Sequence, residues 1–79
     1  MINAYILVHV KPGSTDIVIK DMRKIENIRK ISIIAGDFDL VIRVEVKNLD
    51  KLLKVTNKIQ MIKGVDKTTT HVIEKEIAL

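Results

Sequence analysis

The chain has 79 residues, of which 47% are hydrophobic and 30% are charged, with a formal net charge of +4. This length allows one domain, and so apolar a composition excludes intrinsic disorder. The absence of cysteine excludes disulfides, thiolate metal sites and cysteine nucleophiles.

No apolar run reaches the roughly 18 residues of a membrane span, and no signal sequence opens the chain. We therefore expect a cytoplasmic domain without membrane contact. The eleven lysines are spread along the whole chain rather than gathered on one segment. Nucleic-acid surfaces usually need clustered basic residues with arginine or aromatic side chains among them, so direct nucleic-acid binding is not expected.

The first third of the chain predicts a strand and a helix. Residues 2–10 are almost continuously apolar, which is typical of a central strand covered on both faces. Residues 11–13, Lys-Pro-Gly, end the strand. Ser14 is expected to cap a helix over 14–26, which Asn27 closes. The side chains at helical spacing that would face the core are Val18, Met22 and Ile25.

A β-hairpin is expected next. Residues 28–35 predict the second strand, and Gly36-Asp37 predicts a tight turn, because glycine tolerates positive φ and aspartate bonds local amides. Residues 38–46 alternate between apolar and more polar side chains, as in a strand with one buried face. The apolar face would consist of Phe38, Leu40, Ile42, Val44 and Val46.

The last third predicts a second helix and a fourth strand. Asn48 is expected to cap a helix that runs through about residue 60, and Gly64 after a lysine is typical of its end. Residues 65–77 then predict a strand. The expected core stripe of the helix is Leu49, Leu52, Leu53, Thr56 and Ile59.

The order β-α-β-β-α-β is the ferredoxin-like, split βαβ arrangement of the α+β class. Right-handed crossovers place both helices on one face of a four-stranded antiparallel sheet, with strand order 4-1-3-2. The strands are too apolar to leave the other face wet. We therefore expect two copies to pair through their sheets as a homodimer, in a dimeric α/β barrel.

No residue pattern indicates catalysis or a cofactor. His9 and His71 are expected to be ordinary strand residues, because no third ligand is spaced to complete a metal site. No nucleophile-and-base pair and no glycine-rich phosphate loop is present. The sequence thus predicts no catalytic residues, no metal and no cofactor.

The segment Gly36-Asp37-Phe38-Asp39-Leu40 is the most informative in the chain, because two carboxylates flank one of only two aromatic residues. A simple turn explains Gly36, Asp37 and Phe38 in this segment. It does not account for Asp39 on an otherwise apolar strand. That carboxylate could meet an ammonium group, a backbone amide or a cation from a neighbouring subunit.

Three consecutive threonines open the fourth strand, and β-propensity alone would explain them. Thr68 and Thr70 point to the same face, so two hydroxyls could serve one polar ligand. The third and fourth strands are not neighbours in the expected sheet. A site that combines Asp39 with these threonines would therefore need a second subunit.

Taken together, these segments resemble the ligand-sensing domain of the Lrp/AsnC regulators, the RAM domain, over residues 1–79. The resemblance implies a dimer formed through the sheets and a larger assembly of dimers. It also implies a small effector, typically an amino acid, bound between dimers. The segments that carry it are Val10-Lys11-Pro12-Gly13, Gly36-Asp37-Phe38-Asp39-Leu40, and Gly64-Val65 followed by Thr68 and Thr70.

Carried over by position, the resemblance assigns the effector site to Gly36, Asp37, Phe38 and Asp39, with Thr68 and Thr70 as contributors before Thr69. Full regulators of this kind carry a helix-turn-helix domain, whereas this chain begins directly at its first strand. The expectation is a single effector-binding domain that has no DNA-binding domain of its own. It would act through a partner such as a full-length Lrp/AsnC-type regulator in the control of amino acid metabolism.

Two other interpretations remain open from the sequence. The first is a structural adaptor, in which the hairpin makes subunit contacts and binds no small molecule. The second is a small enzyme, since dimeric α/β barrels include cofactor-free monooxygenases and acylphosphatases share this strand order. With only Tyr5 and Phe38 as aromatics, and no arginine in the first loop, the enzyme is the weaker of the two.

Overall fold

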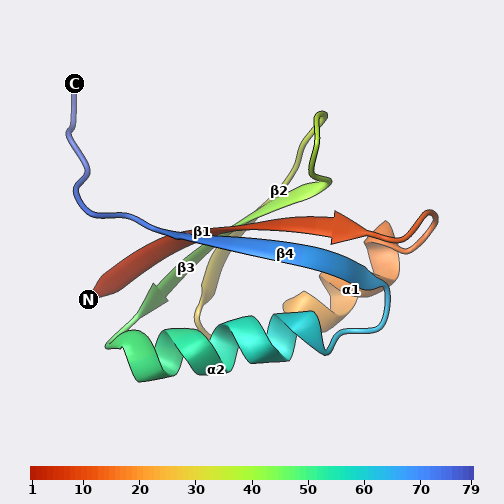
Figure 1. Cartoon of the computed structure of the whole chain (residues 1–79), viewed down its shortest axis with the longest axis horizontal. Coiled ribbons are helices and arrows are strands. Elements are labelled where there is room, and N and C mark those ends of the chain that lie inside the picture. Colours follow the sequence, from red (N-terminus) through yellow and green to blue (C-terminus); the bar gives the residue numbers. More distant parts are fainter.

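Six elements follow one another in the computed structural model, which describes residues 1–79, and their order is the expected β-α-β-β-α-β. Both helices lie on the same side of the sheet (Figure 1). The fold is therefore the ferredoxin-like α+β arrangement. The elements are β1 (Ile2–Val10), α1 (Thr15–Met22), β2 (Ile28–Ile33), β3 (Leu40–Val46), α2 (Leu49–Gln60) and β4 (Val65–Val72).

The four strands form one antiparallel sheet in the order β2-β3-β1-β4, which confirms the predicted 4-1-3-2 order. The register pairs Tyr5 with Arg43 on one side and with His71 on the other. Because paired residues point to the same face, this register decides which side chains meet the helices and which lie on the uncovered face.

The core lies between the sheet and the two helices. On β1 and β3 every second residue is buried toward the helices, as the sequence predicted for residues 40–46. Phe38 was predicted on the same buried face, but it lies before the start of β3 and its ring contacts His9 instead of the core. Each fully buried isoleucine or leucine contributes about 1.5–3 kcal/mol by leaving water. The buried set is Ala4, Ile6, Val8, Val18, Met22, Leu40, Ile42, Val44, Val46, Leu52, Val55 and Ile59.

Helix α2 uses a different face from the one expected. Leu52 is 6% exposed, but Leu53 is 59% exposed, and Val55 is buried in its place. Apolar residues occur around much of this helix, so its 3.6-residue period fits more than one stripe. The angle at which the helix packs on β1, β3 and β4 selects the face, and the predicted stripe through Leu49, Leu53 and Thr56 was wrong.

Several element boundaries also differ from the prediction. Helix α1 ends at Met22 rather than near Asn27, and residues 23–27 continue as hydrogen-bonded turns. Ser14 occupies the N-cap position, but its side chain makes no capping bond, whereas Asn48 accepts a bond from the Lys51 backbone as expected. Strand β4 is shorter than predicted and ends at Val72.

The β2–β3 connection is longer than the predicted tight turn. It spans residues 34–39, and the Ile34 backbone N–H donates to the Asp39 carbonyl at 2.9 Å across its base. Gly36 lies at its tip with a φ of 154°. With this longer loop, the segment just before β3 contacts the end of β1, where the Asp39 backbone N–H donates to the Val8 carbonyl.

Gly64 joins α2 to β4 where the chain passes against α1. Its φ is +100°, and a Cβ there would lie 2.8 Å from the Cβ of Ser14 and 3.0 Å from a methyl group of Val18. Its carbonyl accepts a bond from the Lys11 backbone N–H at 2.8 Å. Only glycine satisfies both the conformation and the space. Neither helix of the fold is long and apolar enough to cross a membrane.

Candidate functional site

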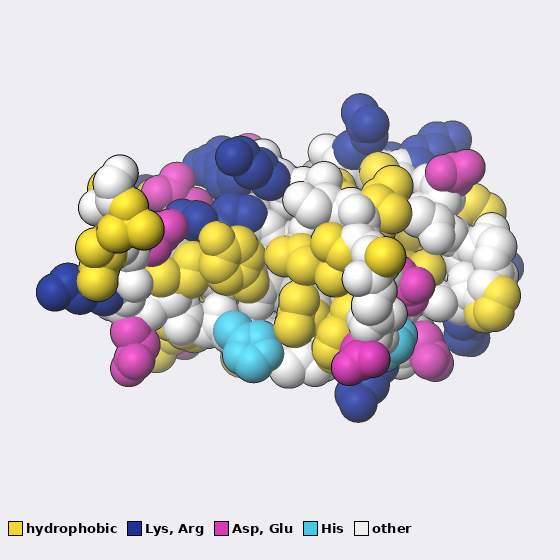
Figure 2. Space-filling view, turned by 90° about the horizontal axis from the view of Figure 1, so that it is seen from above, with side chains coloured by type: hydrophobic (Ala, Val, Ile, Leu, Met, Phe, Trp, Pro, Cys, Tyr) yellow, Lys and Arg dark blue, Asp and Glu magenta, His cyan; other side chains and the backbone are white.

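The sheet face opposite the helices is uncovered, and we call it the open face. In Figure 2, which views the molecule from this side, hydrophobic side chains gather in the middle, with charged groups around them. Strand alternation and register place on it the side chains of Asn3, Tyr5, Leu7, His9, Lys30, Ser32, Val41, Arg43, Glu45, Lys67, Thr69 and His71.

Asp39 fixes the hairpin loop to the end of β1. Its backbone N–H donates to the Val8 carbonyl at 2.9 Å, and its Oδ2 accepts a hydrogen bond from the Val10 backbone N–H at 2.8 Å. The β1–β4 register shifts between His9 and Val10, because His9 pairs with Lys67 and Val10 pairs with Val65, which leaves Asp66 of β4 as the extra residue. The carboxylate therefore pairs with a backbone amide of its own chain, one of the three partners that the sequence left open.

His9 and Phe38 complete a small cluster around this carboxylate. The two rings are 4.6 Å apart between centroids and tilted by 34°. Nδ1 of His9 lies 3.6 Å from Oδ2 of Asp39, which is an ionic contact only when the imidazole is protonated. Oδ1 of Asp39 has no donor within the chain. The cluster thus offers one unpaired carboxylate oxygen next to an aromatic surface.

The six residues predicted for the site divide into two groups. Phe38 and Asp39 meet at the end of the open face, and Gly36 and Asp37 are exposed in the same loop. Thr68 and Thr70 pair with Val8 and Ile6, which are buried toward the helices, so these two threonines lie on the helix-covered side.

Thr68 also accepts a bond from Nε2 of Gln60 on α2 at 3.0 Å. Thr69, opposite Leu7, is the threonine of this run that shares the open face with Asp39. Within one chain the sheet itself therefore separates Asp39 from Thr68 and Thr70. Only residues of different chains could place these groups around one ligand.

A second polar cluster lies at the other end of the open face. The Arg43 guanidinium is 5.4 Å from the centre of the Tyr5 ring and donates to Asn3 at 3.1 Å and to Glu76 at 2.9 Å. The hydrogen bond to Glu76 raises the pKa of Arg43 above its ordinary value, so the guanidinium stays charged. Its Nε is buried without a partner.

Four hollows mark the surface, and none of them is lined by a residue of the loop 34–39 or by His9. One of about 450 Å³ lies on the open face around Arg43. No three histidine, aspartate or glutamate side chains gather as metal ligands. One chain therefore presents the hairpin cluster on an open surface, without walls to enclose a ligand.

His9 was predicted to be an ordinary strand residue, but it lies beside both Phe38 and Asp39 in this cluster. The only available signal was its place next to the strand end at Lys11-Pro12-Gly13. Alternation along β1 points the Val8 carbonyl and the Val10 N–H to the same side, where Asp39 meets both, and no residue type in the sequence indicates that contact.

The sequence model of the Lrp/AsnC ligand-binding domain matches residues 3–78. The chain is 33% identical over 72 residues to the HTH-type transcriptional regulator FL11 of Pyrococcus abyssi, covering 91% of this chain and 48% of the regulator. It is also 33% identical over 78 residues to a homocitrate synthase of Sulfolobus acidocaldarius, covering 95% of this chain and 17% of the enzyme. The chain thus spans half or less of the curated relatives it matches.

Two solved structures share the fold at lower identity. The protein TTHA0845 of Thermus thermophilus is superimposable with a TM-score of 0.92 at 22% identity, covering 100% of both chains. The transcriptional regulator NMB0573 of Neisseria meningitidis, solved as an L-Met complex, gives a TM-score of 0.90 at 16% identity. That match covers 99% of this chain and 53% of the regulator. At these identities the likeness concerns the fold.

Proposed function

Because this chain belongs to the Lrp/AsnC ligand-binding domain family, we propose that it binds an amino acid effector and forms homodimers that associate further. It is an effector-binding module related to transcriptional regulators. In the proposed function it takes part in regulating amino acid metabolism through a partner, a full-length regulator of the same family. The observation that carries the proposal is the cluster of Asp39, Phe38 and His9 at the end of the open face.

The open face supports a dimer formed through the sheets. Leu7 and Val41 are paired neighbours on it, and both helices lie on the other side of the sheet. The apolar centre of this face is costly to leave in water, and burying it against a second copy stabilises both chains. At 79 residues the core of one chain is small, which makes such burial valuable.

The hairpin cluster supports an amino acid as the ligand. The unpaired Oδ1 of Asp39 can accept from an ammonium group, and the Phe38 ring offers an apolar contact for a side chain. Because the cluster is open in one chain, a neighbouring chain must supply the groups that bind the carboxylate of the amino acid. Occupation of the site would therefore favour the assembled state over separate dimers, which is how an effector would change assembly.

The relatives are consistent with this chemistry. The Neisseria regulator of this fold was solved in complex with L-Met, so a protein of this architecture does bind an amino acid. FL11 is an HTH-type transcriptional regulator, and the present chain matches about half of it. For this chain, a regulator of that type is the proposed partner.

A second candidate partner is a biosynthetic enzyme. The 78 residues that match the Sulfolobus homocitrate synthase amount to 17% of that enzyme, at the same 33% identity as the match to FL11. A domain of this kind thus also occurs as part of an enzyme. This chain would in that case pass the effector signal to an enzyme rather than to a DNA-binding regulator.

The proposed site is tested by Asp39→Asn, which keeps an acceptor for the Val10 N–H but removes the charge that an ammonium ligand needs. We expect weaker amino acid binding by calorimetry, with the dimer unchanged by sedimentation. Glu26→Ala, which removes a carboxylate outside the open face, is the matched control. Undiminished binding by Asp39→Asn would refute this site, whereas no amino acid binding by the unmodified protein would favour the structural adaptor.

A further inference from the structure

His9 is a titratable side chain in contact with the carboxylate that is proposed to bind the effector. Its Nδ1 lies 3.6 Å from Oδ2 of Asp39, and its ring centroid is 4.6 Å from that of Phe38. The side chains of His9 and Asp39 are 37% and 45% exposed, so the imidazole can exchange its proton with water. The imidazole can therefore change charge beside the proposed ammonium site.

The proton on this imidazole decides what the pair offers to a ligand. A neutral imidazole leaves the negative charge of Asp39 available, whereas a protonated one is a cation at ion-pair distance from the same carboxylate. Because Oδ2 already accepts from the Val10 N–H and faces the imidazole, an ammonium group would bind at Oδ1. Like charges about 4–6 Å apart oppose each other, so the protonated imidazole would weaken that binding.

The other charged groups around His9 keep their charge over the pH range in which an imidazole titrates. Lysine side chains ordinarily lose their proton well above pH 7.5, and aspartate side chains gain theirs well below pH 5.5. The imidazole is thus the group of this cluster whose charge changes between these values. The charged neighbours, besides Asp39, are Lys11 on β1, Asp37 in the loop, and Asp66 and Lys67 on β4.

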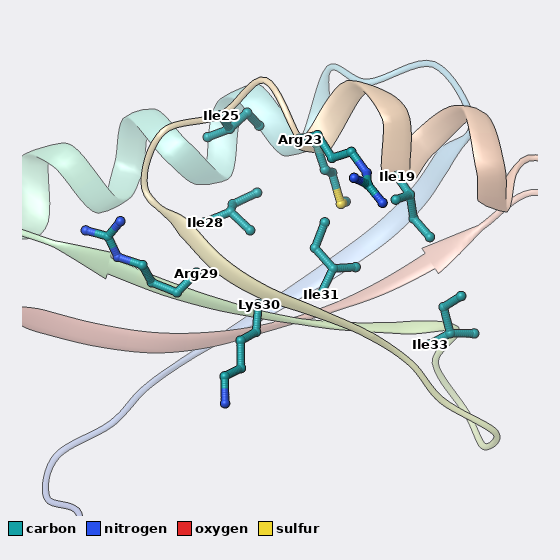
Figure 3. Close-up of a pocket in the computed structure, with 9 residues that line it drawn as sticks. Ile19, Arg23, Ile25, Ile28, Arg29, Lys30, Ile31 and Ile33 are labelled. Atoms are coloured by element: carbon teal, nitrogen blue, oxygen red, sulfur yellow. The ribbon is translucent and has the colours of Figure 1, made fainter.

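The cations of β2 belong to other parts of the surface. Figure 3 shows the hollow of about 440 Å³ between α1 and β2, where Lys30 projects away from the helices, and no residue of the hairpin cluster lines this hollow. Arg29 contacts Glu45 at 3.4 Å, and Lys30 is the strand partner of Arg43. The charge next to Asp39 is therefore set locally, by His9 and its neighbours on β1 and β4.

We propose that a proton on His9 competes with the ammonium group of the effector for Asp39, so that effector binding strengthens as the pH rises from 5.5 to 7.5. The coupling is reciprocal, because a bound ammonium group lowers the affinity of the imidazole for its proton, and binding releases that proton to the solvent. The chain would then respond to acidity as well as to its effector. The inference rests on the proposed effector site and specifies how pH regulates it.

The test is calorimetry on the full chain with each of the twenty amino acids in turn, at pH 5.5 and at pH 7.5. Low ionic strength is needed, because salt screens charges that are partly exposed. The α-ammonium group of a free amino acid keeps its proton over this range, so the protein is the titrating partner. We expect the Kd of a bound amino acid to be about threefold higher at pH 5.5 than at pH 7.5.

Two variants identify the titrating group. His9→Gln keeps a polar side chain beside Phe38 but has no titratable proton, and its Kd should differ by less than about 1.5-fold between the two pH values. His71→Gln is the matched control and should keep the full pH dependence. His71 lies on the same open face but pairs with Tyr5, away from Asp39.

Proton release gives a second readout that also works on the unmodified protein. Binding heats at pH 6.5, in two buffers of different ionisation enthalpy, should show the release of about a quarter to a half of a proton per chain. The same release is expected from His71→Gln, and none from His9→Gln. A side chain with a purely structural role would not produce this difference.

The possible failures are distinguishable. An equal Kd at both pH values, or a pH dependence that persists in His9→Gln, would overturn the inference and leave the effector site in place. No binding of any amino acid at either pH would refute the proposed function and the inference with it. Sedimentation at both pH values checks assembly, and a dimer lost at pH 5.5 in His9→Gln as in the unmodified protein would assign the pH effect to the subunit interface instead.

Discussion

The carboxylate of Asp39 accepts a hydrogen bond from the Val10 backbone N–H at 2.8 Å, between residues 29 positions apart in the chain. This bond joins the β2–β3 loop to the end of β1. The residue proposed to bind an effector therefore also holds the loop in place. One oxygen, Oδ2, has the structural role, and Oδ1 remains for a ligand.

The double role predicts different stabilities for two Asp39 variants. Asp39→Ala removes the acceptor for the Val10 N–H and should lower the free energy of unfolding by about 1 kcal/mol, because the group is only partly buried. Asp39→Asn keeps an oxygen at that position and should lose less than half as much. Urea unfolding of both variants measures the difference, and equal losses would argue that the bond contributes nothing.

Gly64 should tolerate a side chain much less well than Gly13, although both have positive φ. Gly64→Ala adds a Cβ 2.8 Å from the Ser14 Cβ and should cost about 2–3 kcal/mol through strain and displacement of α1. A Cβ at Gly13 meets nothing within 4 Å, so Gly13→Ala should cost about 1 kcal/mol. Thermal melting of the two variants compares them directly, and a reversed order would contradict the packing of α1 against this turn.

Adjacent leucines on α2 should respond very differently to truncation. Leu52→Ala opens the core and should cost about 2–4 kcal/mol, since Leu52 is only 6% exposed. Leu53→Ala should change stability by less than about 0.5 kcal/mol. Chemical denaturation of both variants measures their free energies of unfolding. A large loss of stability in Leu53→Ala alone would contradict the helix face described above.

The ion pair between Glu76 and Arg43 predicts local rather than global effects. Glu76→Gln should raise the hydrogen-exchange rate of the Ile73 amide severalfold by loosening the segment after β4, while the melting temperature stays within about 2 °C, because exposed ion pairs contribute little. Glu74→Gln is the control, because Glu74 belongs to the same segment but makes no ion pair within the chain. Equal exchange in both variants would show that the ion pair with Arg43 does not hold this segment in place.

Much of the fold could be predicted because local patterns agree with the tertiary structure. The alternation of residues 40–46 indicated which face of β3 is buried, and Asn48 marked the start of α2 correctly. The face of α2 could not be predicted in the same way. Leu49, Leu52 and Leu53 are chemically equivalent in the sequence, and only the position of the helix on the sheet distinguishes them.

Part of the candidate site was also predictable from local sequence patterns. An aspartate on an apolar strand stood out in the sequence, and the structure places Asp39 at the end of the open face beside Phe38. The contribution of His9 depends on its contacts with Phe38 and Asp39, which no residue type in the sequence indicates. Which side of the sheet the threonines face depends on the β1–β4 register, which pairs Thr68 with Val8 and leaves Thr69 on the open face.

The most direct test of the account is a melting-temperature screen of the unmodified protein against the twenty amino acids at millimolar concentration. A ligand at about a hundred times its Kd adds about 2.7 kcal/mol of stability, a shift of about 10 °C or more in so small a domain. We predict a large, selective shift with one amino acid or a related group, which is lost in Asp39→Asn. No shift with any amino acid, or a shift that Asp39→Asn leaves unchanged, would contradict an effector site at this hairpin.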